Sequence, residues 1–172
     1  MRIAMILNQV QAGVGTKDDV DVTLTATKEA LGPGVTLRPM LKEQGKSLLV
    51  TIYLGDRTYT NDKEVIHRKI KGMLARLQID ALICGPSFNY PEFSQMCAEI
   101  AKDINETTQV KAICAMSQEM QEVISTYKDS LEIVKMPKKG GVGLNQSYEA
   151  IGQLLAAKET GSDKTTYASL VY

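Results

Sequence analysis

Residues 81–105 read ALICGPSFNYPEFSQMCAEIAKDIN, which is a short apolar run, a turn and a segment with helical spacing. The run Ala81–Cys84 has the length and composition of a strand that is buried on both faces. From Pro91 to Asn105 apolar side chains recur every three or four residues, and proline suits the first turn of a helix. The stretch therefore predicts a buried strand followed by a helix, and the helix packs on the sheet and carries the chain back along it.

The same unit of strand and helix recurs along the chain. The other apolar runs that predict buried strands are Ile3–Leu7, Leu48–Leu54, Val110–Ala115 and Leu131–Val134. Helical spacing is found over Asn61–Leu77, Ser117–Tyr127 and Leu144–Ala157. Because parallel strands need crossover connections, this alternation predicts a three-layer α/β domain with a five-stranded parallel sheet. The expected strand order is 2-1-3-4-5, the flavodoxin-like or Rossmann-like arrangement.

Two segments depart from this regularity. Residues 11–34 are polar and glycine-rich, and they are longer than an ordinary connection, so they predict a functional or disordered loop. Residues 160–172 are a polar linker followed by an apolar tail, as in a chain that is cut short or that docks on something. We expect one flavodoxin-like domain over residues 1–159, followed by this tail.

Composition excludes several classes of protein. Basic and acidic residues number 20 each, so charge gives no indication of a nucleic acid or membrane partner. The first apolar run is too short to span a membrane, and no cleavage site follows it, so we expect a cytoplasmic protein. The three cysteines are widely spaced and in apolar surroundings, which is typical of reduced thiols. No spacing of metal ligands is present, so we expect no metal site. The sequence is also compatible with a homo-oligomer.

Polar residues follow the predicted strands where the carboxyl ends of a parallel sheet form a crevice for ligands. Asn8 and Gln9 follow the first strand, Asp56 the second, Asn89 the third and Glu119 the fourth. The carboxylates could orient a substrate amine or transfer a proton, and Asn89 could recognise a carboxylate. The alternatives are a turn cap for Asp56, an Asx turn for Asn89 and a first-turn helix residue for Glu119.

Glycines at two of these ends suggest contacts with an anion. Gly13 and Gly15 would let backbone N–H groups approach a phosphate or carboxylate, although no dinucleotide fingerprint is present and plain turn chemistry is the alternative. Lys139, Gly140 and Gly141 precede a predicted helix, so they form an anion-binding candidate or else a flexible turn.

Cysteine and histidine offer few candidates. Cys84 and Cys114 lie within apolar strands and are expected to be inert core residues. Cys97 lies about two turns into its helix. Its thiol therefore either packs on the sheet or faces the crevice as a possible reactive thiol. His67, the only histidine, has no neighbouring triad or ligand spacing and is expected at the surface.

Several blocks of residues occur together in a fixed order along the chain. They are Leu7–Gln9 with Ala12–Gly15, Gly32–Gly34, Gly55–Asp56 with Tyr59, Cys84–Asn89, Cys97 with Ile100–Lys102, and Tyr127–Asp129 leading into Ile133–Lys135. In these blocks the chain resembles the amino-terminal region of component B of the glycine, sarcosine and betaine reductases and related oxidoreductases. The resemblance covers nearly all of residues 2–158.

The resemblance implies anaerobic, selenium-dependent reductive cleavage of the C–N bond of a small amino acid or betaine. In that family a selenolate attacks the α-carbon, the amine leaves, and the carboxymethyl group passes to a small selenoprotein partner. A selenolate suits this role because it is ionised at neutral pH and strongly nucleophilic. The redox-active selenocysteine or cysteine lies in the family's carboxyl-terminal half.

The resemblance therefore makes the chain part of an oxidoreductase. We expect the selenocysteine in a missing carboxyl-terminal half or a partner subunit, no cofactor bound by this chain, and no activity of the chain alone. The alternative interpretation is a non-catalytic flavodoxin-like module that binds a nucleotide, a flavin or an anionic small molecule in the same crevice.

Overall fold

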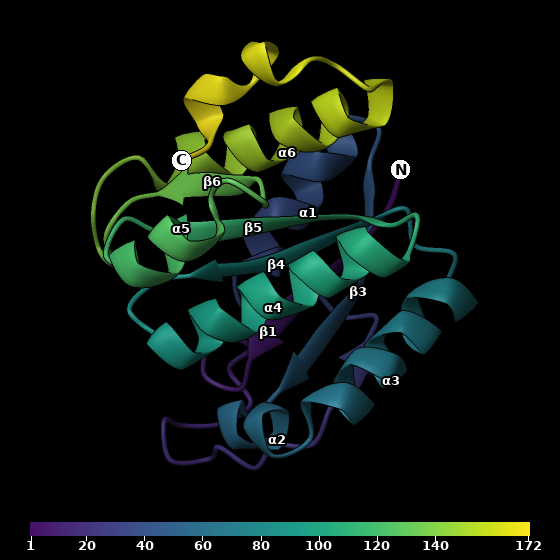
Figure 1. The fold of residues 1–172 in the computed structure, drawn as a ribbon, viewed down its shortest axis with the longest axis vertical. Helices are drawn as coiled ribbons and strands as arrows, with labels where there is room; N and C mark the ends of the chain where they lie inside the picture. Colours follow the sequence, from purple (N-terminus) through teal and green to yellow (C-terminus); the bar gives the residue numbers. More distant parts are fainter.

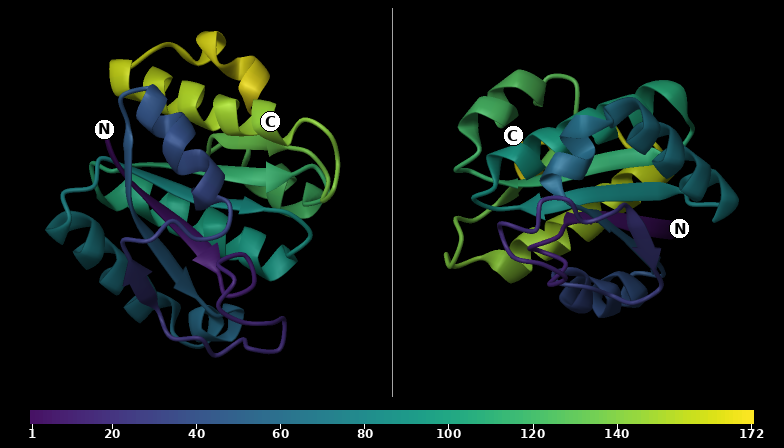
Figure 2. Two further views of the ribbon diagram at one scale, coloured as in Figure 1. Left: turned by 180° about the vertical axis from the view of Figure 1, so that it is seen from behind. Right: turned by 90° about the horizontal axis from the view of Figure 1, so that it is seen from below.

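A six-stranded sheet separates two groups of helices in the computed structural model, which describes residues 1–172 (Figure 1). The strands are β1 (Arg2–Asn8), β2 (Thr25–Thr27), β3 (Ser47–Leu54), β4 (Ala81–Ser87), β5 (Lys111–Ser117) and β6 (Ile133–Met136). The helices are α1 (Gly34–Glu43), α2 (Asp56–Asn61), α3 (Lys63–Arg76), α4 (Pro91–Thr107), α5 (Gln121–Tyr127) and α6 (Leu144–Thr160). Helices α1 and α6 cover one face of the sheet, and Figure 2 brings them to the front.

The prediction of a five-stranded, fully parallel sheet of order 2-1-3-4-5 is wrong. The observed order is β2-β3-β1-β4-β5-β6, and the edge pair β2–β3 is antiparallel. The additional strand comes from the long segment expected to be a loop. Its sequence, Thr-Ala-Thr, has no apolar side chain larger than alanine. An edge strand of three residues can pair without burying a hydrophobic face, so apolar patterning gives no sign of it.

The apolar runs are buried because helices cover both faces of the sheet. Along β1, Ile3, Met5 and Leu7 face α1 and α6, whereas Ala4 and Ile6 face the other layer. Neighbouring side chains on a strand point to opposite faces, so a doubly covered strand must be apolar throughout. The helices α3, α4 and α5 supply the second layer of core, and Figure 1 shows them in front of the sheet.

Two helical segments were not predicted. Helix α1 contains Pro39 and begins at Gly34, two residues that disfavour helix interiors, but Leu37 and Leu41 are buried on the sheet and offset that cost. Helix α2 is a short turn directly after β3, and Asp62 separates it from α3.

The carboxyl-terminal tail packs on the edge of its own sheet. Val171 forms an antiparallel bridge with Val134 of β6, and the N–H of Tyr172 donates to the carbonyl of Ile133 at 3.1 Å. Tyr167 and Val171 are buried in the core layer of α6. The apolar end therefore covers the free edge of β6. Among the helices, none is both long and apolar enough to cross a membrane.

Candidate functional site

A pocket opens at the carboxyl ends of the strands, where the order of the sheet reverses. Strand β1 lies between β3 and β4, so the loops that follow β1 and β4 part to opposite sides of the sheet. Such switch points are the usual ligand sites of open α/β sheets. The pocket has a volume of about 540 Å³. Its lining comprises Val10, Lys17, Val20, Asp56, Arg57, Thr60, Asn89, Tyr90, Pro91 and Glu92.

The long segment after β1 is held beside this pocket by the start of α2. The carbonyl of Val20 accepts hydrogen bonds from the N–H groups of Arg57 at 3.0 Å and Thr58 at 3.2 Å, which are free donors at a helix start. The Arg57 guanidinium also forms a bidentate ion pair with Asp21. A Cβ on Gly55 would lie 2.1 Å from the carbonyl oxygen of Val20, so only glycine allows this approach. In Figure 1 the segment, drawn in purple and dark blue, lies beside α2.

Asn8 and Gln9 lie next to Asp56, and both are fully buried and outside the lining of the pocket. The orientation of each amide is set by a backbone partner. The Asn8 Oδ1 accepts from the N–H of Gln11 at 2.9 Å, and the Gln9 Nε2 donates to the carbonyl of Thr16 at 3.4 Å. This leaves the Asn8 Nδ2 and the Gln9 Oε1 buried without a hydrogen-bond partner. A buried polar atom without a partner is costly, so the fold leaves one unpaired donor and one unpaired acceptor beside Asp56.

Asp56 stands at the wall of the pocket with one buried carboxylate oxygen, Oδ1, that has no partner. Burial raises the pKa of Asp56, and the Glu92 carboxylate raises it further. The amides of Asn8 and Gln9 adjoin the carboxylate and act in the opposite direction, although neither closes a hydrogen bond with the Oδ1. An unpaired, partly buried carboxylate is suited to receive a cationic group.

Tyr90 connects the pocket to two lysines from distant loops. The Lys17 Nζ lies 5.7 Å and the Lys139 Nζ lies 5.8 Å from the centre of the Tyr90 ring. Lys17 belongs to the segment after β1, and Lys139 to the loop after β6. Asn89, the residue before Tyr90, is exposed at the same wall. The pocket therefore carries positive charge at Tyr90, while the rest of its lining includes the amide of Asn89 and the carboxylates of Asp56 and Glu92.

The other predicted site residues lie around this pocket rather than in its lining. The N–H groups of Gly13 and Gly15 are used within the turn, where they donate to the carbonyls of Val10 and Gln9. No helix begins directly after β1, in contrast to the phosphate-binding arrangement of dinucleotide folds. The anion-binding role of both glycines stays a prediction.

Glu119 and the loop after β6 meet at the neighbouring strand ends. The Glu119 Oε2 accepts from Ser117 Oγ at 3.1 Å and from the N–H of Lys139 at 3.4 Å. Glu119 lies before α5, not within its first turn. Gly140 and Gly141 are exposed beside Lys139, so of these residues only Lys139 reaches toward the pocket through Tyr90.

Cys97 is fully buried between α4 and the sheet and does not face the crevice. Burial raises the pKa of the Cys97 thiol well above its ordinary value. The thiol of Cys114 donates to the carbonyl of Cys97 at 3.5 Å, and Cys84 lies opposite Cys114 on the neighbouring strand. All three thiols are buried in one layer of the core, and burial raises the pKa of the Cys84 thiol as well.

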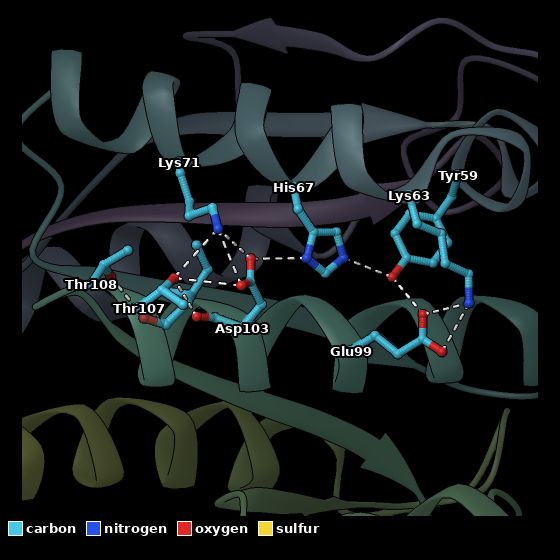
Figure 3. Close-up of polar contacts among 9 residues, drawn as sticks. Tyr59, Lys63, His67, Lys71, Glu99, Asp103, Thr107 and Thr108 are labelled. Atoms are coloured by element: carbon cyan, nitrogen blue, oxygen red, sulfur yellow. Dashed lines mark hydrogen bonds and ion pairs between the residues drawn. The ribbon is translucent and has the colours of Figure 1, made fainter.

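A second polar cluster, outside the crevice, joins α2 and α3 to α4 (Figure 3). The Tyr59 hydroxyl donates to Glu99 Oε2 at 2.6 Å and lies 2.9 Å from His67 Nε2. The His67 Nδ1 lies 2.9 Å from Asp103 Oδ2. Lys63 and Lys71 pair with the two carboxylates at 2.8 Å and 3.0 Å. His67 is partly exposed, in line with the expectation of a surface residue, but it belongs to a network that the sequence did not reveal.

The spacing of this cluster is visible in the sequence once the helices are known. Lys63, His67 and Lys71 recur every four residues on α3. Glu99, Asp103 and Thr107 recur in the same way on α4. Residues at this spacing share a helix face, so the two series are stripes of complementary charge. Only the packing of α3 beside α4 brings them into contact.

Comparison with known proteins gives the chain a family. The family model described as glycine/sarcosine/betaine reductase selenoprotein B matches residues 1–169. The sarcosine reductase complex component B subunit beta of Peptoclostridium acidaminophilum is 24% identical over 161 residues, which are 94% of this chain and 36% of that protein. The betaine reductase complex component B subunit beta of the same organism is 27% identical over 159 residues, 91% of this chain and 36% of that protein.

A third relative is the glycine reductase complex component B subunit gamma of Carboxydothermus hydrogenoformans, which is 24% identical over 92% of this chain and 36% of that protein. The chain therefore spans 36% of the length of these relatives. No solved structure shows significant similarity to the chain.

Proposed function

The chain belongs to the glycine/sarcosine/betaine reductase selenoprotein B family, and we propose that it forms the substrate-binding part of an oxidoreductase that cleaves the C–N bond of a small amino acid or betaine. The observation that carries the proposal is the unpartnered, buried Oδ1 of Asp56 in the pocket lining, with unpartnered atoms of Asn8 and Gln9 next to it. A zwitterion of a few atoms carries the opposite charges and the hydrogen-bonding groups that these atoms lack.

Each end of such a substrate has a receptor in the crevice. Asp56 receives the cationic nitrogen, because its carboxylate is partly buried and has no basic partner. The Lys17 ammonium, which lines the pocket, receives the carboxylate, while the buried Asn8 amide lies beside Asp56. With both ends held, the carbon between them is kept in one orientation for attack.

The nucleophile comes from outside these residues in this proposal, from a partner subunit or a further segment that carries selenocysteine or cysteine. The burial of all three cysteines, which raises the pKa of the Cys84 and Cys97 thiols, supports this assignment. The selenolate or thiolate forms a bond to the α-carbon while the C–N bond breaks, and the amine leaves with the bonding electron pair. Dithiol groups of the partner supply the two electrons that later reduce the carbon–selenium bond.

The proposal is tested by mixing the full chain with a component B polypeptide that carries the redox-active selenocysteine or cysteine. Release of ammonia or methylated amine from glycine, sarcosine and betaine is measured with a dithiol reductant. We expect release only from the mixture. Asp56→Asn should lower the rate of amine release by about tenfold or more, because a charged hydrogen bond to the substrate is lost.

The matched control is Asp18→Asn, which removes an exposed carboxylate from the segment after β1 without touching the pocket lining. This variant should release amine at the rate of the unchanged chain. Release from none of the three amines, or equal release by Asp56→Asn and Asp18→Asn, would contradict the proposal.

A further inference from the structure

Helix α2 carries Asp56 at the wall of the pocket and is attached to the core by a single buried side chain. Of its six residues only Tyr59 is buried, with 2% of its surface exposed. Asp56 and Tyr59 are three positions apart, so the two side chains lie on the same side of the helix. The position of the Asp56 carboxylate therefore depends on where the Tyr59 side chain is held.

Glu99 of α4 holds the Tyr59 hydroxyl and gathers polar groups from its neighbours (Figure 3). Its Oε2 accepts from the Tyr59 hydroxyl at 2.6 Å, and its two oxygens accept from Lys63 of α3 at 3.0 Å and 2.8 Å. Its Oε1 also accepts from the Gln95 Nε2 at 2.8 Å, and the same Nε2 donates to the Tyr127 hydroxyl at 2.9 Å. The Glu99 carboxylate therefore fixes α2 and α3 against one turn of α4.

Helix α4 also contributes a carboxylate to the lining of the pocket. Glu92 lies in the first turn of α4 and lines the pocket together with Asp56. Burial raises the pKa of Asp56, and the Glu92 carboxylate raises it further. Glu92 and Glu99 are two helical turns apart on one face of α4. The contact between α2 and α4 at Glu99 thus sets both the burial of Asp56 and its distance from Glu92.

We infer that Glu99 is a positioning residue, which acts through the Tyr59 hydroxyl to hold Asp56 where it binds the cationic nitrogen of the substrate. The inference rests on the proposed function and adds a residue that is outside the pocket lining. Without the bond between Tyr59 and Glu99, α2 is free to shift away from α4. Asp56 then becomes more exposed, moves away from Glu92 and leaves the position that suits the substrate nitrogen.

This displacement has a signature in the dependence of amine release on pH. Ionised Asp56 binds the cation, so release should rise as the pH increases through the pKa of Asp56. The other charged side chains that line the pocket are Lys17, Arg57 and Glu92. Greater exposure and greater distance from Glu92 both lower the pKa of Asp56, so the midpoint should fall by about half a pH unit. The KM should rise by about tenfold, because the carboxylate is misplaced.

The experiment measures amine release by the full chain mixed with a component B polypeptide that carries the redox-active selenocysteine or cysteine. Substrate concentration and pH are both varied. Glu99→Leu and Tyr59→Phe each remove the bond, so both should show the raised KM and the lowered midpoint. Glu99→Gln keeps an oxygen that accepts from the Tyr59 hydroxyl, and it should restore both values toward those of the unchanged chain.

Asp103→Asn is the matched control, because Asp103 joins α4 to His67 and Lys71 of α3 and makes no hydrogen bond or ion pair with α2. This variant should be less stable but keep the KM and the midpoint. A role of Glu99 in stability alone would lower release equally at every pH, with both values unchanged. That result, or the same shift in Asp103→Asn, would overturn the inference and leave the proposed function standing.

Titration of the Asp56 carboxyl group, followed by NMR of the full chain alone, makes the same comparison without substrate or partner. The midpoint should be lower in Tyr59→Phe than in the unchanged chain and in Asp103→Asn. Equal midpoints in all three would overturn the inference. Absence of amine release from the unchanged mixture would contradict the proposed function, and the NMR titration would still decide whether Glu99 positions Asp56.

Discussion

The hydroxyl of Tyr59 donates a hydrogen bond of 2.6 Å to Glu99 and so ties α2 to α4. A phenol has one proton to give, so its oxygen accepts from the Nε2 of His67. The Nδ1 of His67 faces the carboxylate of Asp103, which can only accept. Because α2 begins at Asp56, the network also holds the wall of the crevice in place.

Loss of the Tyr59 hydroxyl should destabilise the fold. Tyr59→Phe leaves His67 and Glu99 without their shared partner, and we expect the free energy of unfolding to fall by about 1–3 kcal/mol. Urea denaturation measures it. Tyr53→Phe is the control, because the hydroxyl of Tyr53 makes no hydrogen bond, and it should change stability little. Equal stability of the two variants would argue that the network contributes nothing.

The carboxylates of the network predict sensitivity to acid. Burial by itself raises the pKa of Glu99, but hydrogen bonds from Gln95, Lys63 and Tyr59 outweigh it and hold the pKa below its ordinary 4.5. Burial also raises the pKa of Asp103, but Lys71 and His67 lower it by more, so that the pKa of Asp103 lies below its ordinary 3.8. A lowered folded-state pKa means stability that is present above the ordinary value and is lost as the pH falls through the folded one.

Unfolding followed by circular dichroism between pH 7 and pH 2.5 measures whether stability is lost on acidification. The unchanged chain should lose stability as the pH falls below about 4.5, and Asp103→Asn should be less stable at pH 7 but lose less on acidification. The exposed Asp129 provides the control substitution, Asp129→Asn, whose pH profile should follow that of the unchanged chain. If the stability of Asp103→Asn fell with pH as steeply as that of the unchanged chain, the proposed link between the ionisation of Asp103 and stability would be refuted.

Asp56 predicts the opposite dependence on pH. Burial raises its pKa above 3.8, so ionisation costs stability as the pH rises from that value through the folded-state pKa. Asp56→Asn removes that cost, and its melting temperature should exceed that of the unchanged chain at pH 7.5. The gain should shrink as the pH approaches 3.8. A melting temperature that is lower at every pH would contradict the burial of an unpaired charge at this position.

Gly55 is required for the close approach of the segment after β1. In Gly55→Ala the new Cβ would lie 2.1 Å from the Val20 carbonyl, so we expect a loss of about 1–3 kcal/mol in unfolding free energy. Gly72→Ala is the matched control on α3, where a Cβ meets nothing within 4 Å. It should stabilise the protein by up to about 1 kcal/mol, because alanine is the better helix former. Chemical denaturation of both variants measures whether the free energy of unfolding falls in Gly55→Ala and rises in Gly72→Ala.

The three cysteines should be unreactive in the folded protein. Burial raises the pKa of the Cys84 and Cys97 thiols, and Cys114 is buried beside them. A thiol reagent such as dithionitrobenzoate should label none of them in native buffer and all of them in denaturant. Rapid labelling of one thiol in native buffer would show a reactive cysteine and would reopen the assignment of the nucleophile to a partner.

Parts of the fold and of the site could be predicted from local pattern. The runs Ile3–Leu7 and Ala81–Cys84 are strands because a strand covered on both faces has no position for a polar side chain. Asn8, Asp56 and Asn89 could be placed at the carboxyl ends of strands, since the end of an apolar run is visible in the sequence. The antiparallel strand Thr25–Thr27 could not, because edge pairing uses backbone groups that every sequence has.

The sequence by itself determined the strands β1, β3, β4, β5 and β6 and the helices α3, α4, α5 and α6, because burial and helical spacing are properties of neighbouring residues, but it did not determine β2, α1 or α2. Only the tertiary structure decided that Tyr59 and His67 meet Glu99 and Asp103, since these contacts join elements that are distant in the chain. It also decided that the Asp56 Oδ1 at the pocket wall and the buried Gln9 Oε1 beside Asp56 lack partners. A hydrogen-bonding deficit depends on everything that surrounds an atom, and no local pattern contains that information.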